Sequence, residues 1–200
     1  HQIDVVIVAG DIYDLTNPAP DAVETLRDAL KNILATGAKI VMTAGNHDSA
    51  TRLGFAGAFS ALAGLHLITD AALISSPVQL QDEHGAIDFY GIPYQVFSAA
   101  IDVVRAEIAK RKKEKNRSVV IAHTFVAGAE SESSDSERAI TKEPLVAGGV
   151  DSVPVKVFNG PDYVALGHIH SRKEIGNHIR YSGAILHNSF KEANKPRGGW

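Results

Sequence analysis

The 200-residue sequence contains no cysteine, and this absence excludes several kinds of site. A chain without thiols has no disulfide framework, no thiolate metal site and no cysteine nucleophile. The sequence also lacks any apolar run near the roughly 18 residues that a membrane-spanning helix needs. Neither sign of charge dominates, because 20 lysine and arginine residues stand against 23 acidic residues and give a net charge of −3. Any contact with nucleic acid is therefore expected to be local rather than spread over the whole chain.

The sequence does hold enough apolar material for one globular core. Hydrophobic residues make up 44% of it, which fits a single domain over residues 1–200. The chain starts at His1 close to a strand-like run and stops at Trp200 with no closing element, so we expect a domain truncated at both ends. A chain without cysteine is compatible with the cytoplasm, which is the location that we expect.

Apolar patterns predict strands that alternate with helices. The β-branched run at Val5–Ala9 and residues 39–44 are typical of buried strands, and we expect a helix between them that has Asp21 as its N-cap and ends at Gly37. Further helices are expected near residues 53–62 and over residues 98–113. Further strands are expected over residues 72–80, 87–92, 118–122, 163–166 and 178–182. The alternation predicts parallel strand pairs and a layered α/β domain.

Four short polar motifs each follow directly on a predicted strand. They are Gly10-Asp11-Ile12-Tyr13-Asp14, Gly45-Asn46-His47-Asp48, the lone His123, and Gly167-His168-Ile169-His170. Because the carboxyl ends of strands in an open α/β sheet are where ligands bind, these side chains can converge on one point. Aspartate, asparagine and histidine suit manganese, iron or zinc better than copper or calcium, and a carboxylate can bridge two cations. The set therefore predicts a pair of metal ions.

Each motif taken alone also has a structural interpretation. Gly10-Asp11 is a common strand-to-turn signal, and His123 by itself fits a hydrogen-bonded core histidine. The ordered set, in which every member follows a strand, favours the functional interpretation.

In this order, the motifs resemble those of the calcineurin-like metallophosphoesterases. Four longer segments are more closely similar to the family of bacterial SbcD nuclease subunits: His123-Thr124-Phe125-Val126-Ala127-Gly128, Gly148-Gly149-Val150-Asp151, Tyr163-Val164-Ala165-Leu166-Gly167-His168 and Tyr181-Ser182-Gly183. The resemblance runs through nearly all of the chain. It implies a four-layer αββα sandwich, with two packed sheets and helices outside.

The resemblance also implies two divalent metal ions, with Mn²⁺ as the expected ion. Asp11 would bridge the ions; Asn46, His123 and His168 would complete one site, and His170 would belong to the other. The family carries an Asp-x-His motif on its first strand, upstream of Gly10-Asp11, and residues 1–9 of this sequence do not contain one. We therefore expect the second metal site to be incomplete in this chain, and the chain alone to cleave its substrate poorly or not at all.

Three further residues receive catalytic roles from the resemblance. His47 would lie near the scissile phosphate, where it would stabilise charge or protonate the leaving group rather than bind metal. Asp48 and Asp14 would orient the groups around them.

The implied function is metal-dependent cleavage of DNA phosphodiester bonds, as exonuclease and endonuclease, in DNA repair, recombination and replication. The implied partners are DNA, an SbcC-type ATPase subunit and a second copy of the full-length chain. Two alternatives remain open. One is an enzyme of the same superfamily that acts on a small phosphoester or a phosphoprotein, and the other is a scaffold that keeps the fold without catalysis.

Two charged segments lie outside the motifs. Residues 110–117 hold six lysine and arginine residues, which fit either a basic helix end favoured by the helix dipole or a patch that contacts phosphates. Residues 130–138 (ESESSDSER) contain no apolar residue and are expected to form a solvated loop. The alternative for this segment is a role at the rim of the site.

Overall fold

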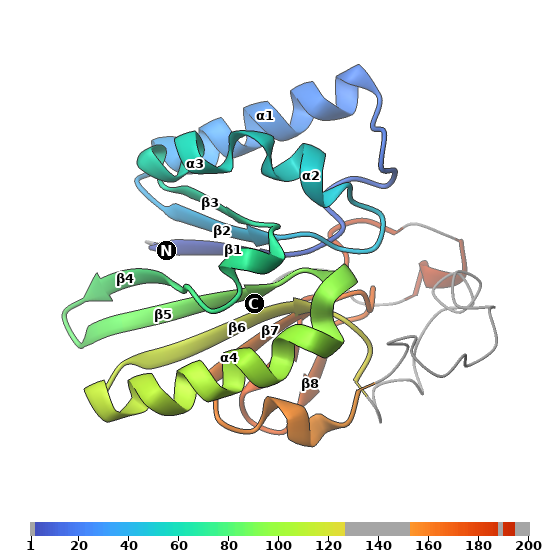
Figure 1. The fold of residues 1–200 in the computed structure, drawn as a ribbon. Helices are drawn as coiled ribbons and strands as arrows, with labels where there is room; N and C mark the ends of the chain where they lie inside the picture. Colours follow the sequence, from blue (N-terminus) through green and yellow to red (C-terminus); the bar gives the residue numbers. More distant parts are fainter. Residues whose placement is uncertain (1–2, 127–152, 188–189, 195–200) are drawn as a thin grey trace.

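Two β-sheets pack face to face in the computed structural model, which describes residues 3–126, 153–187 and 190–194 (Figure 1). The first sheet is parallel and has the strand order β1-β2-β3. Its strands are β1 (Val5–Ala9), β2 (Lys39–Thr43) and β3 (Leu65–Ile68). Since β1 and β2 pair in parallel with Ala9 opposite Thr43, the loops that follow them leave the same edge of the sheet.

The second sheet has six strands in the order β4-β5-β6-β7-β9-β8. The strands are β4 (Val78–Asp82), β5 (Gly85–Ile92), β6 (Arg117–His123), β7 (Tyr163–Gly167), β8 (Lys173–Ile175) and β9 (Ile179–Tyr181). Strands β5, β6, β7 and β9 are parallel, whereas β4 and β8 pair antiparallel at the two edges. The prediction of an α/β domain with parallel strands is therefore confirmed.

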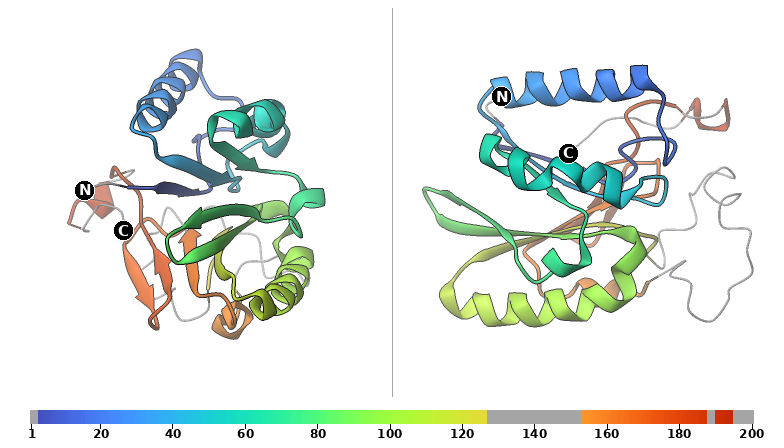
Figure 2. Two further views of the ribbon diagram at one scale, coloured as in Figure 1. Left: turned by 90° about the vertical axis from the view of Figure 1, so that its left-hand side faces the viewer. Right: turned by 45° about the horizontal axis from the view of Figure 1, so that its top comes forward.

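Helices cover the outer faces of both sheets (Figures 1 and 2). Helices α1 (Pro20–Ala35), α2 (Ala50–Leu53) and α3 (Gly57–Ser60) lie over the first sheet, and α4 (Phe97–Arg111) lies under the second. This layering is consistent with the expected αββα arrangement. None of the described helices is long and apolar enough to cross a membrane.

Short 3₁₀ turns connect these elements. The described turns are η1 (Gly54–Ala56), η2 (Ala61–Ala63), η3 (Ala71–Leu73), η4 (Tyr94–Val96), η5 (Lys112–Glu114), η7 (Val155–Phe158) and η8 (Phe190–Glu192).

The core divides into two layers because successive strand side chains point to opposite faces. Phe89 of β5 and Ile121 of β6 are buried between the sheets together with Val41 and Ile68 of the first sheet. Their strand neighbours, such as Tyr90, are buried on the opposite face, in the cluster that includes residues of α4. Both sheets are thereby fixed relative to each other, which holds their loops in place.

Several sequence predictions of local structure are wrong. The strand expected over residues 72–80 is the turn η3 followed by β4, because the Asp70 side chain caps the turn by accepting from Ala72 N (2.9 Å). Helix α1 begins at Pro20 with Ala19 as its N-cap instead of Asp21. The single helix expected near residues 53–62 is broken into short helical turns, and β3 and β8 were not predicted. Residues 130–138 and 148–151 lie outside the described residues.

The basic segment lies at the amino end of β6. Arg111 pairs with the buried Asp88 at 3.4 Å, Arg117 pairs with Asp82, and Lys110 pairs with Glu107 at 3.1 Å. The four polar motifs follow the carboxyl ends of their strands, at the other end of the sheets. This placement favours the structural interpretation of residues 110–117.

Candidate metal centre

Four predicted ligands from four strands meet at one point between the two sheets. The Oδ1 atom of Asn46 lies 3.0 Å from His123 Nε2 and 3.0 Å from His168 Nδ1. The two histidine nitrogens lie 3.1 Å apart. Asp11 completes the group, since its Oδ2 atom lies 3.2 Å from His123 Nε2. Asp11, His123 and His168 form a set whose ligand atoms all lie within 4.8 Å of one another.

The loops that carry these residues approach each other so closely that side chains would not fit at two glycines. A Cβ atom at Gly45 would lie 2.2 Å from Asp11 Oδ1, and one at Gly167 would lie 1.8 Å from the carbonyl oxygen of Ala9. Asp11 and His168 themselves have φ angles of +50° and +95°, which are uncommon for residues other than glycine. Such backbone strain is concentrated at functional sites.

Asp48 holds two of the motifs together. Its carboxylate accepts hydrogen bonds from the backbone N–H groups of Ile12 (3.1 Å), Tyr13 (3.0 Å) and Gly45 (2.8 Å). Asp48 is only 3% exposed, so these contacts replace its hydration. The residue joins the loop after β1 to the loop after β2 and acts on Asp11 through the backbone. Among the described residues, Asp48 thus positions these two loops through their backbone, and the part in catalysis predicted for it stays a prediction.

The donor set fits a divalent cation. His123 Nδ1 lies 2.8 Å from the carbonyl oxygen of Ala9, which can only accept, so Nδ1 carries a proton and, in the neutral form of the ring, Nε2 presents its lone pair. That lone pair faces the oxygens of Asn46 and Asp11, both of which are acceptors. A group of converging acceptors is stabilised by a cation at its centre. Oxygen and nitrogen ligands of this kind suit manganese, iron or zinc.

Burial controls the charge state of this group. Burial, together with the neighbouring His123, lowers the pKa of His168 to about 3. His168 is therefore neutral near pH 7, as a metal ligand must be. Burial raises the pKa of Asp11, but the side-chain contact with His123 and the backbone N–H of His47 together lower it by more, so that the pKa is below its ordinary value of 3.8 and the carboxylate is ionised near pH 7.

Two aromatic residues that the sequence analysis missed flank the histidines. The ring centroid of Phe125 lies 4.1 Å from that of His168 in an edge-to-face arrangement, and the ring of Tyr94 lies 6.0 Å from His168 and 6.1 Å from His123. Tyr94 follows the carboxyl end of β5 and Phe125 follows that of β6, so the rule that located the ligands could have found both.

His47 lies beside the ligand group. Its backbone N–H donates to Asp11 Oδ1 (3.0 Å), while its ring Nδ1 lies 2.7 Å from the carbonyl oxygen of Asp14. The Asp14 carboxylate is almost fully exposed and lies 3.8 Å from the same nitrogen. The backbone of Asp14, more than its side chain, thus orients His47, and a catalytic role of the Asp14 carboxylate stays a prediction.

His170 is the predicted ligand that lies apart from the others. Among the described residues, the metal-binding group contains His168 but not His170. The Nδ1 atom of His170 instead lies 2.9 Å from Oε1 of Glu192, a residue that no sequence motif indicated. The structure therefore brings together Asp11, Asn46, His123 and His168. His170, two residues after His168 in the chain, contacts the carboxylate of Glu192.

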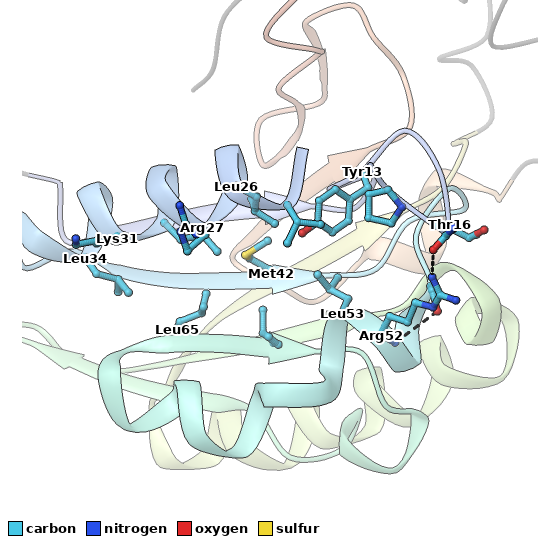
Figure 3. Close-up of a pocket in the computed structure, with 16 residues that line it drawn as sticks. Tyr13, Thr16, Leu26, Arg27, Lys31, Leu34, Met42, Arg52, Leu53 and Leu65 are labelled. Atoms are coloured by element: carbon cyan, nitrogen blue, oxygen red, sulfur yellow. Dashed lines mark hydrogen bonds between the residues drawn. The ribbon is translucent and has the colours of Figure 1, made fainter. Parts of the chain in front are cut away.

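A separate groove of about 690 Å³ lies between helices α1 and α2 (Figure 3). Leu26 and Leu34 from α1, Met42 from β2, Leu53 from α2 and Leu65 from β3 line it. Because this lining is largely apolar, whereas a metal ion binds to oxygen and nitrogen ligands, the groove is a feature separate from the group of metal ligands.

One comparison with known proteins bears on this arrangement. The family model described as calcineurin-like phosphoesterase matches residues 1–172, which include all the residues of the ligand group. Enzymes of this kind hydrolyse phosphoester bonds, and the converging Asp, Asn and His side chains are suited to the divalent metals that such hydrolysis uses. The chain belongs to the calcineurin-like phosphoesterase family.

Proposed function

We propose that this phosphoesterase is a metal-dependent DNA nuclease of the SbcD type. The observation that carries the metal-dependent chemistry is the convergence of Asn46, His123 and His168 within 3.1 Å, next to the ionised Asp11. The proposal of DNA as substrate depends on the segments similar to SbcD subunits. Two of these segments are in direct contact, since the Tyr181 hydroxyl donates to Thr124 O (2.8 Å) and accepts from Val126 N (3.0 Å).

The ligand residues would be shared between two cations. Asp11, Asn46, His123 and His168 would hold one cation, and His170 would contribute to a second. Divalent cations, with Mn²⁺ as the expected ion, would supply Lewis acidity toward the phosphoester and neutralise charge on its oxygens. His123 keeps its proton on Nδ1 through Ala9 and so offers Nε2, whereas His168 offers Nδ1.

His47 would handle a proton near the substrate. Its Nδ1–H donates to the carbonyl oxygen of Asp14, which fixes the ring and leaves Nε2 as the atom that exchanges a proton. In the protonated form, Nε2 would donate to the leaving oxygen or stabilise negative charge on the phosphate. The contact between His47 N and Asp11 Oδ1 keeps this ring next to the ligand group.

The expected partners belong to the same proposal. DNA, an SbcC-type ATPase and a second copy of the chain fit an SbcD-type subunit, and the cytoplasmic location stays a prediction. A second copy could pack against the exposed apolar side chains of η1, α3 and η2, since Phe55, Phe59 and Leu62 are 89%, 78% and 90% exposed. The oligomeric state can be measured by light scattering of the full-length protein, before and after Phe59→Ser.

A substrate comparison tests the proposed function. The full-length protein, loaded with Mn²⁺, would be given end-labelled duplex DNA and, in parallel, bis(p-nitrophenyl) phosphate and a phosphomonoester. We expect efficient cleavage of DNA, lost in Asp11→Asn and retained in the surface variant His84→Ala. Preference for the small esters would favour the alternative phosphoesterase. Binding of Mn²⁺ without hydrolysis of any substrate would favour the scaffold.

A further inference from the structure

Glu192 is a buried carboxylate beside a predicted metal ligand. It lies on η8, is 0% exposed, and its Oε1 atom lies 2.9 Å from Nδ1 of His170. A carboxylate loses its hydration on burial, which is costly unless hydrogen bonds replace it. Phe190 at the start of the same turn is fully exposed. The turn thus buries its acidic side chain and exposes its aromatic side chain to solvent. Hydrophobic packing alone would favour the opposite arrangement, so the burial of Glu192 needs another explanation.

The main chain of His170 is held by a second contact. Its carbonyl oxygen accepts a hydrogen bond from Ala184 N (2.9 Å), in the segment that follows β9. Gly183 permits this approach, because it has a φ angle of +76° and a Cβ atom there would lie 2.7 Å from the same carbonyl oxygen. With the backbone held in this way, the contact with Glu192 sets the rotation of the imidazole ring.

We propose that Glu192 is a positioning residue that fixes the tautomer and orientation of His170, so that His170 offers Nε2 as its ligand atom. A carboxylate oxygen accepts hydrogen bonds, so His170 Nδ1 carries the proton and the lone pair of the ring lies on Nε2. Metal-binding histidines generally donate their other nitrogen in this way, and loss of the acceptor weakens metal affinity by about 10–100-fold. The inference rests on the metal role that the proposed function gives to His170.

Three histidines would then present ligand atoms through different partners. His123 is oriented by the carbonyl oxygen of Ala9 and offers Nε2, and His168 offers Nδ1 to the shared group. His170 differs because its partner is a charged side chain that lies 22 residues later in the chain. Its orientation therefore depends on the docking of η8, which the other two histidines do not need.

Tautomer measurement tests the role of Glu192 directly. In the metal-free protein, ring ¹⁵N NMR of His170 should show a protonated Nδ1 and an unprotonated Nε2. In Glu192→Ala the proton should shift toward Nε2, and Glu192→Gln should restore the original tautomer because its amide oxygen still accepts. Glu192→Met supplies a variant of similar volume without an acceptor if the alanine variant does not fold. Phe190→Ser is the matched control on the same turn and should leave the ring unchanged.

Titration with Zn²⁺, followed on the same resonances, separates this inference from the proposed function. We expect Nε2 of His170 to shift on binding, with at least about 10-fold more Zn²⁺ required in Glu192→Ala than in the wild type and in Glu192→Gln. An unchanged tautomer in Glu192→Ala and Glu192→Met would overturn the role of Glu192. A shifted tautomer together with an Nε2 resonance that never responds to Zn²⁺ would instead overturn the ligand role of His170.

Discussion

The Nδ1 atom of His168 lies 3.1 Å from the Nε2 atom of His123, although 45 residues separate them in the chain. The register of the second sheet explains this distance. His123 is the last residue of β6 and pairs with Gly167, the last residue of β7, so His168 is the next residue along. Its left-handed backbone then turns the ring toward His123 and Asn46. Because both strands end at the same level, their histidines can share one ion.

The first prediction concerns the division of ligands between ions. His168→Ala should remove the most tightly bound Mn²⁺, because His168 belongs to the group whose ligand atoms lie within 4.8 Å of one another. His170→Ala should have a smaller effect on that ion, since His170 is outside this group among the described residues. Calorimetric titration with Mn²⁺ measures both variants, and equal losses would contradict the assignment.

The second prediction concerns His47. His47→Ala should keep the number of bound metal ions while it lowers the cleavage rate by roughly 100-fold or more, as expected for a group that donates a proton or stabilises charge. The measurement pairs elemental analysis of the purified variant with its steady-state rate. His84→Ala, which changes a highly exposed histidine, is the control. Loss of one metal equivalent in His47→Ala would show that His47 is a ligand.

The third prediction concerns Asp48, whose two carboxylate oxygens accept three backbone N–H groups. Asp48→Asn should lower the free energy of unfolding by about 3 kcal/mol, because an amide NH₂ would face at least one of these donors and leave it unsatisfied. Urea denaturation measures the loss. Asp14→Asn is the comparison, since the Asp14 carboxylate is almost fully exposed, and its stability should stay near that of the wild type. Equal effects of the two substitutions would show that the three contacts contribute little.

The parts of the site that follow from strand ends could be predicted from the sequence. Asp11, Asn46, His123 and His168 each come directly after, or at the end of, an apolar run, and the carboxyl ends of parallel strands meet at one edge. Their convergence therefore needs only the strand positions and the parallel arrangement. Glu192 could not be found in this way, because it lies on a turn with no periodic pattern around it and reaches His170 only through the path of the folded chain.

Errors in the predicted fold have local physical causes. Pro77 lies within the range expected for a strand at residues 72–80, and a proline removes one donor from a strand ladder. The side chain of Asp70 also stabilises the turn at Ala71–Leu73 that replaces the first part of this range. The strand β3 has only four residues, Leu65–Ile68, with His66 among them, which is too short for a clear apolar pattern.

The last prediction concerns the pH dependence of stability in the metal-free protein. Burial lowers the pKa of His168 to about 3, whereas an unfolded chain has the ordinary histidine value of 6.5. Between these values the unfolded state binds more protons than the folded state, so the free energy of unfolding should fall as the pH decreases. One pKa unit corresponds to about 1.4 kcal/mol, so the loss from His168 should reach about 2 kcal/mol at pH 5. The pKa of Asp11 is also lowered, which adds a further loss of stability below its ordinary value of 3.8.

Urea denaturation at pH 7 and pH 5, with chelator present, measures the difference for the wild type and for His168→Gln. The glutamine variant cannot titrate at this position and should lose about 2 kcal/mol less than the wild type over this interval. Parallel pH profiles of the two proteins would show that His168 is protonated in the folded state as readily as in the unfolded chain, and the neutral ligand assigned to this position would be incorrect.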